Sequence, residues 1–302
     1  MNIERKEFTD FKDTNVYTRT IIASTNIQIH IKSFFESLPI TPYKVIHKKK
    51  GRKPKSYVPP KREIIQNNSI IFMKNEKNSR GVNPKDPKGK RHGYFRNSIG
   101  LIISISDKFI NVKVSQTGNF HMTGCTTKQH AIETMKSLWK LMNQYKDTYK
   151  YKDKDDTHFK FSLTPIMCNI NFKLNMKINR DELDKFFNQN TEHISTLEPE
   201  GHTGVNIKMK SLKNPELLEI VEVEIDKDNN IKQNHICLQN YKKKNQKIKF
   251  KENECYYNTF LVFQSGQVIM SGRDLVFMKD SYYEFLHILQ KGYVLILEQL
   301  KT

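Results

Sequence analysis

The feature that most constrains the fold of this chain is an internal repeat. The stretch NVKVSQTGNFHMTG at residues 111–124 returns 148 positions later as TFLVFQSGQVIMSG at residues 259–272. Five positions are identical between the copies, and two more exchange Thr for Ser. In each copy an alternating apolar run meets a Ser/Thr-Gly turn and a second alternating run, which is the pattern of a β-hairpin. The sequence therefore predicts two units with the same fold.

The segments that precede the two hairpins also follow one plan. Residues 17–29 and 161–176 alternate like strands. The first leads into a helix candidate at residues 31–38, and the second into a charged helix candidate that Asn179 is suited to cap. An amphipathic helix follows each hairpin as well, so the order strand, helix, strands, helix occurs twice. This order predicts an α+β fold with an antiparallel sheet.

The helices after the hairpins carry apolar stripes at helical spacing. Thr126 and Thr127 are candidate caps for the first of these helices. We interpret both stripes as core that packs against a sheet, not as a binding site. The stripes consist of Ile132, Met135, Trp139 and Met142 in the first copy, and of Tyr282, Phe285, Leu286 and Leu289 in the second.

Two insertions and a linker interrupt this plan. Residues 39–96 contain the basic runs KKKGRKPK and PKDPKGKRHG, which we expect to be mobile loops, with one further strand within residues 64–73. The basic runs suit a nuclear address, a phosphate-binding arm or a solvated loop. Residues 211–256 contain LLEIVEVEID and YKKKNQKIKFK, which predict an extra hairpin on the second repeat. Residues 146–157 are dense in charge and are interpreted as a linker.

Charge and cysteine usage narrow the class of protein. The formal net charge of +19 favours a partner with a phosphate backbone, although a genome rich in A and T is an alternative source of the many lysines. The four cysteines lie far apart, which disfavours a zinc ribbon or a disulfide framework. No apolar stretch approaches the ~20 residues of a membrane span, and the first residues lack a signal-peptide pattern. We therefore expect an intracellular protein without membrane contact.

The sequence does not predict an active site. It lacks a phosphate-binding Gly-rich loop and a nucleophile elbow. His121, His130 and Cys125 lie close together without an acidic partner, and the run of Asp153, Asp155 and Asp156 alternates with lysines. We expect no enzyme, no cofactor and no metal site.

With both hairpins placed, the repeats resemble those of the TATA-box-binding protein family. The family signature ends a strand pair in Phe-x-Ser-Gly and a Thr-Gly before a long helix, and LVFQSGQVIMSG and KVSQTGNFHMTG match it. EPEGHTGVNIKM at residues 198–209 and SIGLIISISDKFINVKV at residues 98–114 are further matches. The resemblance divides the chain into a first repeat at residues 15–145, the linker, and a second repeat at residues 158–302.

The resemblance implies two pseudo-symmetric repeats that form a curved antiparallel saddle, with helices on the convex face. The concave face would bind the minor groove of double-stranded DNA, as in a transcription initiation factor. The Glu-x-Glu contact for transcription factor IIB matches Glu198 and Glu200, so the implied partners are a similar protein and the RNA polymerase machinery. The concave-face positions are Thr20, Ile22, Ser98, Ser115, Thr123, Met167, His202, Phe263 and Ser271.

Several of these positions depart from the family pattern. Of four wedge phenylalanines only Phe263 is kept, and Ser98, Ser115 and His202 stand at the others. The two central base-reading asparagines align with Thr20 and Pro165, while the central threonine pair persists as Thr123 and Ser271.

These losses and the large insertions suggest a viral or fast-evolving member, located in a nucleus, a cytoplasmic viral factory or a virion. A scaffold for protein interactions with the same fold is the first alternative. A nucleic-acid enzyme that uses the fold as a platform is the second alternative, and the lack of a catalytic constellation counts against it.

Overall fold

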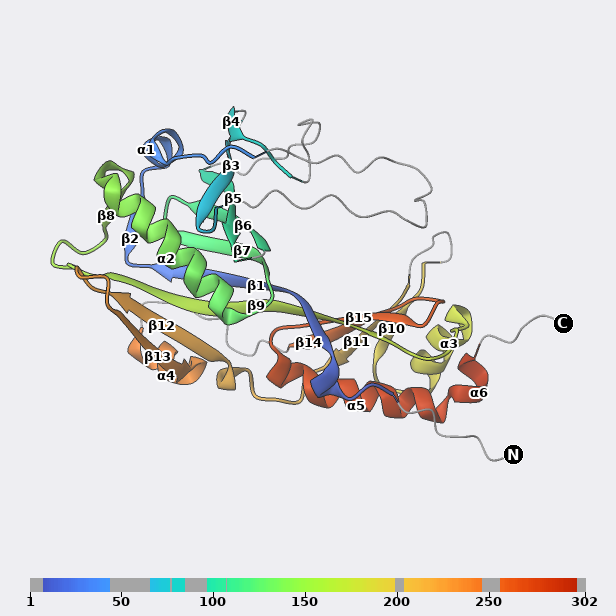
Figure 1. Ribbon diagram of the computed structural model, residues 1–302. Coiled ribbons are helices and arrows are strands. Elements are labelled where there is room, and N and C mark those ends of the chain that lie inside the picture. Colours follow the sequence, from blue (N-terminus) through green and yellow to red (C-terminus); the bar gives the residue numbers. More distant parts are fainter. Residues whose placement is uncertain are drawn as a thin grey trace. The chain divides into compact units, whose positions relative to one another are not determined.

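The chain forms two compact units, which we describe separately. The computed structural model describes residues 8–43, 66–76, 78–84, 97–106, 108–198, 204–245 and 256–297 (Figure 1). Unit 1 comprises Met1–Thr20, Pro165–Ile220 and His235–Thr302, and unit 2 comprises Ile21–Thr164 and Val221–Asn234. The divisions fall inside two long strands, β1 (Asn15–Thr25) and β9 (Phe159–Lys173). Each long strand therefore contributes residues to both units.

Unit 2 is an antiparallel sheet covered on one face by a long helix. Its strands follow the order β1-β7-β6-β5-β3-β4. Helix α2 (Lys128–Gln144) contacts β5 and β7, and a short helix, α1 (Ile31–Ser37), follows the first strand through β2 (Ile27–Ile29). The remaining strands are β3 (Ser69–Asn75), β4 (Asn78–Gly81), β5 (Ser98–Ile105), β6 (Lys108–Ser115) and β7 (Asn119–Cys125).

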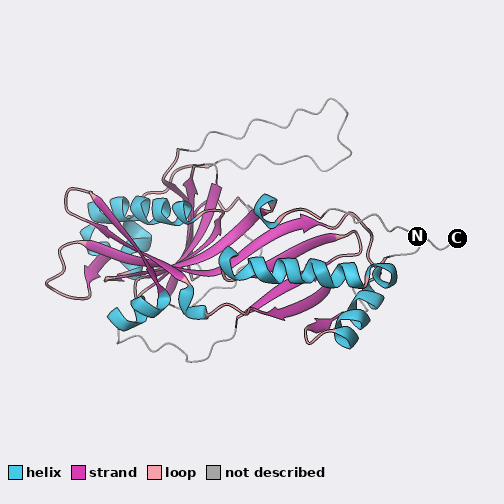
Figure 2. Ribbon diagram, turned by 90° about the horizontal axis from the view of Figure 1, so that it is seen from below, coloured by secondary structure: helices cyan, strands magenta, loops and turns pink. Residues whose placement is uncertain are grey.

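Unit 1 repeats this arrangement. Its strands follow the order β9-β15-β14-β11-β10, and the long helix α5 (Leu275–Lys291) lies along the sheet (Figure 2). Helix α3 (Arg180–Asn190) follows the first strand, and the short α6 (Tyr293–Ile296) packs against α3. The other strands are β10 (Ile194–Thr196), β11 (Val205–Lys210), β14 (Tyr257–Val262) and β15 (Gln267–Gly272).

The two units therefore share one topology. In sheet order, β1-β7-β6-β5 corresponds to β9-β15-β14-β11, and the helix pair α1 and α2 corresponds to α3 and α5. Each sheet is antiparallel throughout the strand pairs of its hairpins. The predicted α+β class with a repeated strand, helix, strands, helix order is confirmed.

The same backbone contact holds each hairpin turn in place. In unit 2 the amide of Thr25 donates to the carbonyl of Gly118 at 3.2 Å, and the amide of Ile29 donates to the carbonyl of Gln116 at 2.9 Å. In unit 1 the amide of Leu174 donates to Gly266 at 2.8 Å. The counterpart of the Ile29 bond, from Ile178 to Gln264, measures 2.9 Å.

This contact explains why both turns contain glycine. Gly118 and Gly266 have φ values of +77° and +78°, a conformation that disfavours other residues. A Cβ atom would lie 1.9 Å from the carbonyl oxygen of Ile27 at Gly118, and 2.2 Å from that of Met176 at Gly266. The repeated glycines are therefore needed for both the turn and its close approach to the first strand.

The predicted apolar stripes form the cores of the two units. Every member of both stripes is buried. Thr127 is the residue that caps α2, since its hydroxyl accepts from the amide of His130 at 3.2 Å. Asn179 caps α3 as predicted, accepting from the amide of Glu182 at 3.3 Å. Burial of a large apolar side chain contributes about 1.5–3 kcal/mol, so the stripes account for much of the driving force for folding.

The second insertion forms a hairpin as predicted, but its second strand is not the basic run, and most of the hairpin does not belong to the second repeat. Strand β12 (Glu219–Ile225) forms a hairpin with β13 (Ile231–Cys237), while the basic run begins in helix α4 (Leu238–Lys244) and continues beyond the described residues. Strand β12 also pairs with the start of β9, from Val221 opposite Leu163 to Ile225 opposite Phe159. Most of the hairpin thus belongs to unit 2, not to the second repeat, because its apolar side chains pack into the core of unit 2.

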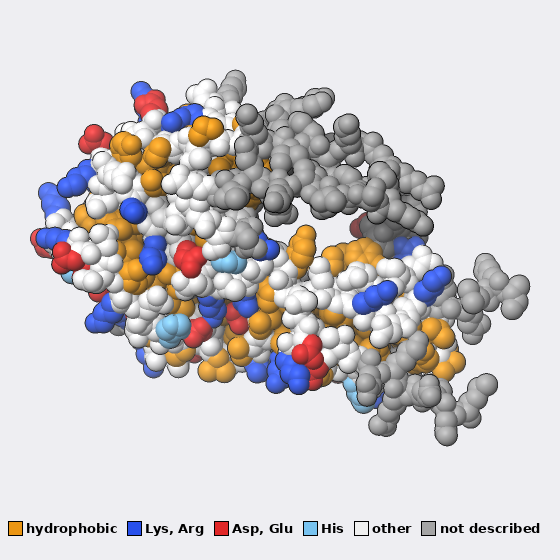
Figure 3. Space-filling model, in the orientation of Figure 1, with side chains coloured by type: hydrophobic (Ala, Val, Ile, Leu, Met, Phe, Trp, Pro, Cys, Tyr) orange, Lys and Arg blue, Asp and Glu red, His pale blue; other side chains and the backbone are white. Residues whose placement is uncertain are grey.

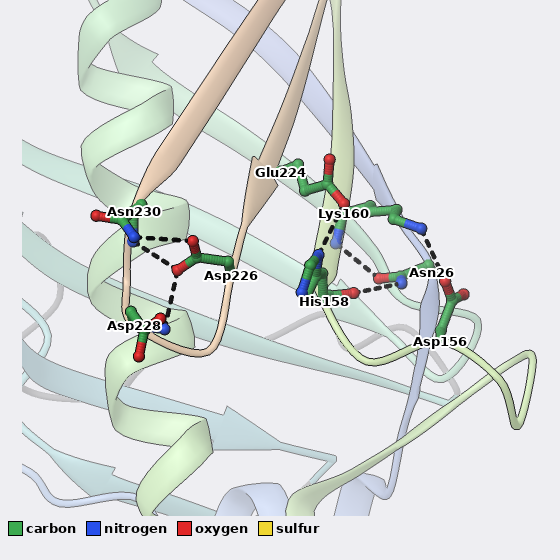
Figure 4. A network of polar contacts seen from close by, with 8 residues as sticks. All are labelled: Asn26, Asp156, His158, Lys160, Glu224, Asp226, Asp228 and Asn230. Carbon is green, nitrogen blue, oxygen red and sulfur yellow. Dashed lines mark hydrogen bonds and ion pairs between the residues drawn. The ribbon is translucent and has the colours of Figure 1, made fainter.

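A polar network connects the start of β9, the end of β1 and strand β12 within unit 2 (Figure 4). The side chain of Asn26 pairs like a backbone group, accepting from the amide of Lys160 and donating to the carbonyl of His158, both at 2.9 Å. The imidazole of His158 lies 3.1 Å from Glu224 on β12, and Lys160 donates to Asp156 at 2.9 Å. The network therefore connects β12 to the first turn of unit 2.

The first insertion and the linker are partly described. Strands β3 and β4 lie within residues 39–96, so the predicted strand near residues 64–73 is confirmed at Ser69–Asn75. The run KKKGRKPK, and all of PKDPKGKRHG except its first residue, lie outside the described residues. The first half of the predicted linker has regular secondary structure. It forms a 3-10 turn at Lys146–Thr148 and then strand β8 (Tyr149–Tyr151), which pairs with β2.

A buried ion pair in unit 1 gives a test of this fold. Arg19 on β1 lies 3.1 Å from Asp274, with side-chain exposures of 11% and 10%. Asp274 also caps α5, accepting from the amide of Val276 at 3.3 Å. We expect Arg19→Met to lower the free energy of unfolding by about 3–5 kcal/mol, because it removes the positive charge that lies beside a buried carboxylate.

Urea denaturation checks this expectation. The control Lys177→Met removes an exposed charge and should cost less than about 0.5 kcal/mol. The double variant Arg19→Met with Asp274→Asn should recover part of the loss, because no buried charge is left alone. A loss for Arg19→Met as small as that of the control would contradict the assignment.

Candidate nucleic-acid interface

Each sheet has one face opposite its long helix, and we call this the open face. In a strand, side chains alternate between the two faces, so residues that alternate with the buried core belong to the open face. Cross-strand pairs then define rows of neighbouring side chains. In unit 2 one row runs from Thr123 on β7 through Asn111 on β6 to Ile102 on β5. A parallel row runs from His121 through Lys113 to Gly100.

The open face of unit 1 is built from the corresponding strands. One row joins Asn171, Ile269, Leu261 and Asn206 on β9, β15, β14 and β11. The next row joins Asn169, Ser271, Thr259 and Lys208 on the same four strands. Apolar, hydroxyl, amide and ammonium groups thus alternate across this face.

The structure places the predicted binding residues in two groups. Ser98 and Ser115 lie opposite each other at one end of the β5–β6 pair in unit 2, and Thr123 stands on the adjacent strand. In unit 1, Ser271 lies in a row between Asn169 and Thr259. Ile22 is half-buried on β1 of unit 2, and Met167 is 38% exposed on β9 of unit 1.

Four positions that the family resemblance points to are less suited to direct contact or lie outside the described residues. Thr20 is 6% exposed and therefore offers little surface. Pro165, at a base-reading position of the resembled family, is buried, and its carbonyl accepts from the Nε of Arg273 at 3.3 Å. His202 and Glu200 lie outside the described residues, whereas Glu198 is exposed.

Phe263 lies at the start of the hairpin turn of unit 1. Its amide donates to the carbonyl of Gln267, and its carbonyl accepts from the amide of Gly266, both at 2.9 Å. Phe260 and Val262 are core residues, so alternation puts Phe263 on the open face with Leu261. The Phe263 ring is half-buried and is not a member of the core cluster.

Sequence reasoning missed the amide side chains of the open faces. Asn169, Asn171 and Asn206 each have an Oδ1 atom that is buried without a hydrogen-bond partner in the described part of the chain. Such groups are rare in folded proteins and call for an explanation. The Nδ2 group of each amide is a donor, which suits the acceptor-rich minor-groove edges of base pairs. Strict alternation along residues 168–173 was the signal that could have found them.

The strands of the two repeats carry no carboxylate. Within the described residues, β1, β5, β6, β7, β9, β10, β11, β14 and β15 contain neither Asp nor Glu, although the chain has 32 acidic residues. Lys113, Lys173, Lys208 and Lys210 are exposed on these strands. A sheet of this composition presents a neutral to positive surface, which an anionic polymer can approach without repulsion.

Acidic groups enter the sheet of unit 2 only on the inserted strand, among the strands that the structure describes. Val221, Val223 and Ile225 of β12 face the core, so Glu222 and Glu224 face the other side. Glu224 lies 3.1 Å from His158, and Glu222 accepts from the side-chain Nδ2 of Asn234 at 3.3 Å. These partners hold both carboxylates on β12, which lies between β9 and β13.

His121 is an open-face histidine with a lowered pKa. Burial is the main cause, and the positive charge of Lys113, which lies opposite it, lowers the pKa further. Its Nδ1 atom has no hydrogen-bond partner among the described residues. The imidazole is therefore neutral at pH 7.

Within the described ranges, no group of three or more His, Cys, Asp or Glu side chains is arranged to hold a metal ion. No helix among these residues is both long and apolar enough to cross a membrane.

The repeated topology and the open sheet faces define a class of α+β proteins with two like units. No protein-family model matches the chain. The chain is 24% identical over 231 residues to a TATA-box-binding protein-like protein of Acanthamoeba polyphaga mimivirus, in an alignment that covers 68% of this chain and 57% of that protein. The predicted resemblance is thereby confirmed as a distant similarity. The chain spans little more than half the length of this relative.

The chain was also compared with solved structures. Methanococcus jannaschii TBP aligns with a TM-score of 0.45 and 11% sequence identity, over 92% of this chain and 98% of that chain.

The position of Phe263 gives a prediction about stability. We expect Phe263→Ala to cost less than about 1 kcal/mol, because the ring lies outside the core. The matched variant Phe260→Ala should cost about 3–5 kcal/mol, since Phe260 is fully buried and stacks on Phe285 at 4.2 Å. Thermal unfolding of both variants measures the difference. Equal losses would mean that Phe263 is a core residue.

The lowered pKa of His121 gives a prediction about pH. The unfolded chain binds a proton at the ordinary histidine pKa of about 6.5, before the folded chain does. Stability tied to His121 is therefore lost as the pH falls below that value. We expect the melting temperature of His121→Gln to fall less than that of the wild type between about pH 7 and pH 5. His287→Gln, on the exposed side of α5, is the control, and an unchanged pH dependence in His121→Gln would disprove the expectation.

Proposed function

We propose that this protein is a DNA-binding transcription initiation factor, a divergent relative of the TATA-box-binding proteins. The open faces of its two units bind the minor groove of promoter duplex DNA. The observation that carries the proposal is the chemistry of those faces. Their strands hold lysines, amides, hydroxyls and apolar groups but no carboxylate within the described residues. The distant similarity to a viral TATA-box-binding protein-like protein supports the same function.

The mode of binding follows from the side chains available. The exposed lysines of the open faces contact phosphates, which gives affinity without sequence information. The amides and the hydroxyls of Thr123 and Ser271 reach base edges, and the Phe263 ring inserts at a base step. Serines at Ser98 and Ser115 are too small to fill a base step, so bending is expected to be weaker at that end. Sequence preference should therefore be modest.

The wider role is proposed from the resemblance alone. Glu198 is exposed, as a partner-binding residue must be, and we propose that it and Glu200 contact a protein similar to transcription factor IIB. Recruitment of RNA polymerase would follow, with no catalytic step by this chain. The net charge of +19 suits action where duplex DNA is concentrated, in a nucleus or a cytoplasmic viral factory. On the side drawn in Figure 3, acidic side chains lie scattered among lysines and apolar groups.

Fluorescence anisotropy with a labelled duplex tests the proposal. The double variant Lys208→Glu with Lys210→Glu reverses two exposed charges of the open face of unit 1. We expect weaker binding, and a slope of log affinity against log salt that falls by about 0.9 for each lysine that contacts a phosphate. Lys279→Glu with Lys291→Glu makes the same charge change on helix α5, on the opposite face, and should leave the slope almost unchanged.

The alternative function is a scaffold for protein interactions with the same fold. The serines at two wedge positions and the buried Pro165 favour it. No binding of duplex DNA at low salt would decide for the scaffold. Binding that both double variants weaken equally would show that the charge of the whole chain, and not the open face, is responsible.

A further inference from the structure

Unit 2 has a groove on its helix side that the proposed DNA-binding surface does not use. The groove has a volume of about 580 Å³. One wall is helix α2, the second is the segment at residues 66–68, and the third is the inserted hairpin of β12 and β13. It lies beside α2, which covers the face of the sheet opposite the open face. The groove therefore exists only because both insertions add walls to the repeat.

The walls of the groove are held in fixed conformations. Asn68, at one rim, has a φ of +62° and accepts a hydrogen bond from the Ser137 hydroxyl of α2 at 2.9 Å. Asn229, at the opposite rim, has a φ of +65° in the hairpin turn. Asp226 fixes this turn, because its carboxylate accepts from the amides of Asp228 and Asn230 at 2.9 and 2.8 Å (Figure 4). A preformed groove loses little entropy when a ligand binds.

The floor and rim carry different chemistry. Leu141, Ile225 and Ile231 provide aliphatic surface, and the amides of Gln66, Asn67 and Gln144 provide donors and acceptors. Lys136 and Lys140 also line the groove, one helical turn apart on the same side of α2. No carboxylate lines the groove, and neither lysine has an ion pair within the described residues. The groove is therefore apolar below and positive at its α2 rim.

The aromatic residue of the groove disfavours a nucleobase as the ligand. Trp139 is 5% exposed, and its ring stacks on Phe159 at 4.3 Å with an interplanar angle of 6°. Tyr149 packs edge-on against it at 5.1 Å. With both neighbours in place the indole has no free face on which a base could stack, and stacking is the usual means of holding an unpaired base.

We propose that this groove binds an acidic peptide segment of a protein partner. A leucine, isoleucine or phenylalanine of the segment would lie on the aliphatic floor, and its Asp or Glu side chains would face Lys136 and Lys140. The amides of the rim would bond the peptide backbone. This combination of an apolar anchor, a few polar contacts and complementary charge is typical of specific peptide sites.

The test uses the full chain and fluorescein-labelled peptides in an anisotropy assay. The probes are short peptides of glutamates around one central leucine, isoleucine or phenylalanine. We expect at least one to bind, and Lys136→Glu with Lys140→Glu to weaken its affinity roughly tenfold or more, since two attractions become repulsions. Ile231→Thr, which keeps a β-branched side chain, should weaken binding through the floor. Lys146→Glu with Lys150→Glu reverses two exposed charges outside the groove and is the matched control.

Three results would overturn the proposal. One is that no glutamate peptide of the panel binds, or that peptides with lysine in place of glutamate bind equally well. Another is equal affinity for the groove variant and its control. The third is loss of duplex DNA binding by Lys136→Glu with Lys140→Glu without any peptide binding, which would assign the groove to nucleic acid. The open-face variant Lys208→Glu with Lys210→Glu must keep its peptide affinity, so failure of the DNA proposal remains distinguishable.

Discussion

The structure of both units depends on the contact between a hairpin turn and the segment that follows the first strand. Each unit has two such backbone hydrogen bonds, donated by Thr25 and Ile29 in unit 2 and by Leu174 and Ile178 in unit 1. They join segments that are about ninety residues apart in the chain. This contact fixes which strand lies beside the first strand, and it places the short helix that follows. The order of the whole sheet then follows from the hairpins. Glycine at the turn is the condition for the contact, because its backbone approaches the carbonyl groups too closely for any Cβ.

This arrangement separates two kinds of surface in each unit. The face under the long helix takes most of the apolar side chains, and the open face combines hydroxyl, amide and basic groups with a few apolar ones such as Leu261 and Ile269. Acidic side chains are excluded from the strands of the repeats and appear on β12, within the strands described. The helix side of unit 2 is modified by the insertions, which build the groove beside α2. One repeat thus carries two surfaces of different geometry, a sheet face and a groove, and both lack carboxylates among the described residues that form them.

The sequence predicted the parts of the fold that repeat and alternate. The hairpins, the apolar stripes and the caps at Thr127 and Asn179 follow from local patterns that packing then reinforces. The partner of β12 was predicted wrongly, because β13 is mostly exposed and shows no alternation, while the basic run near Tyr241 suggested a strand. The amides of the open faces were not predicted, because the resemblance to a family identifies only those positions at which that family contacts DNA. Their relevance appears only when cross-strand register brings Asn171 and Asn206 into one row.

The inserted hairpin also determines when unit 2 can be completed during synthesis. Val221, Val223 and Ile225 pack in the core of unit 2 with Phe159 and Phe161, all of which follow the first repeat in the chain. A nascent chain that ends after α2 therefore lacks part of the apolar surface that its own sheet must bury. The ribosome has to add 93 further residues after α2 (237 − 144) before both β12 and β13 are complete and can dock. The first repeat therefore completes its core during translation only after most of the second repeat has been synthesised. Until then, the sheet of the first repeat has an unpaired edge that is exposed.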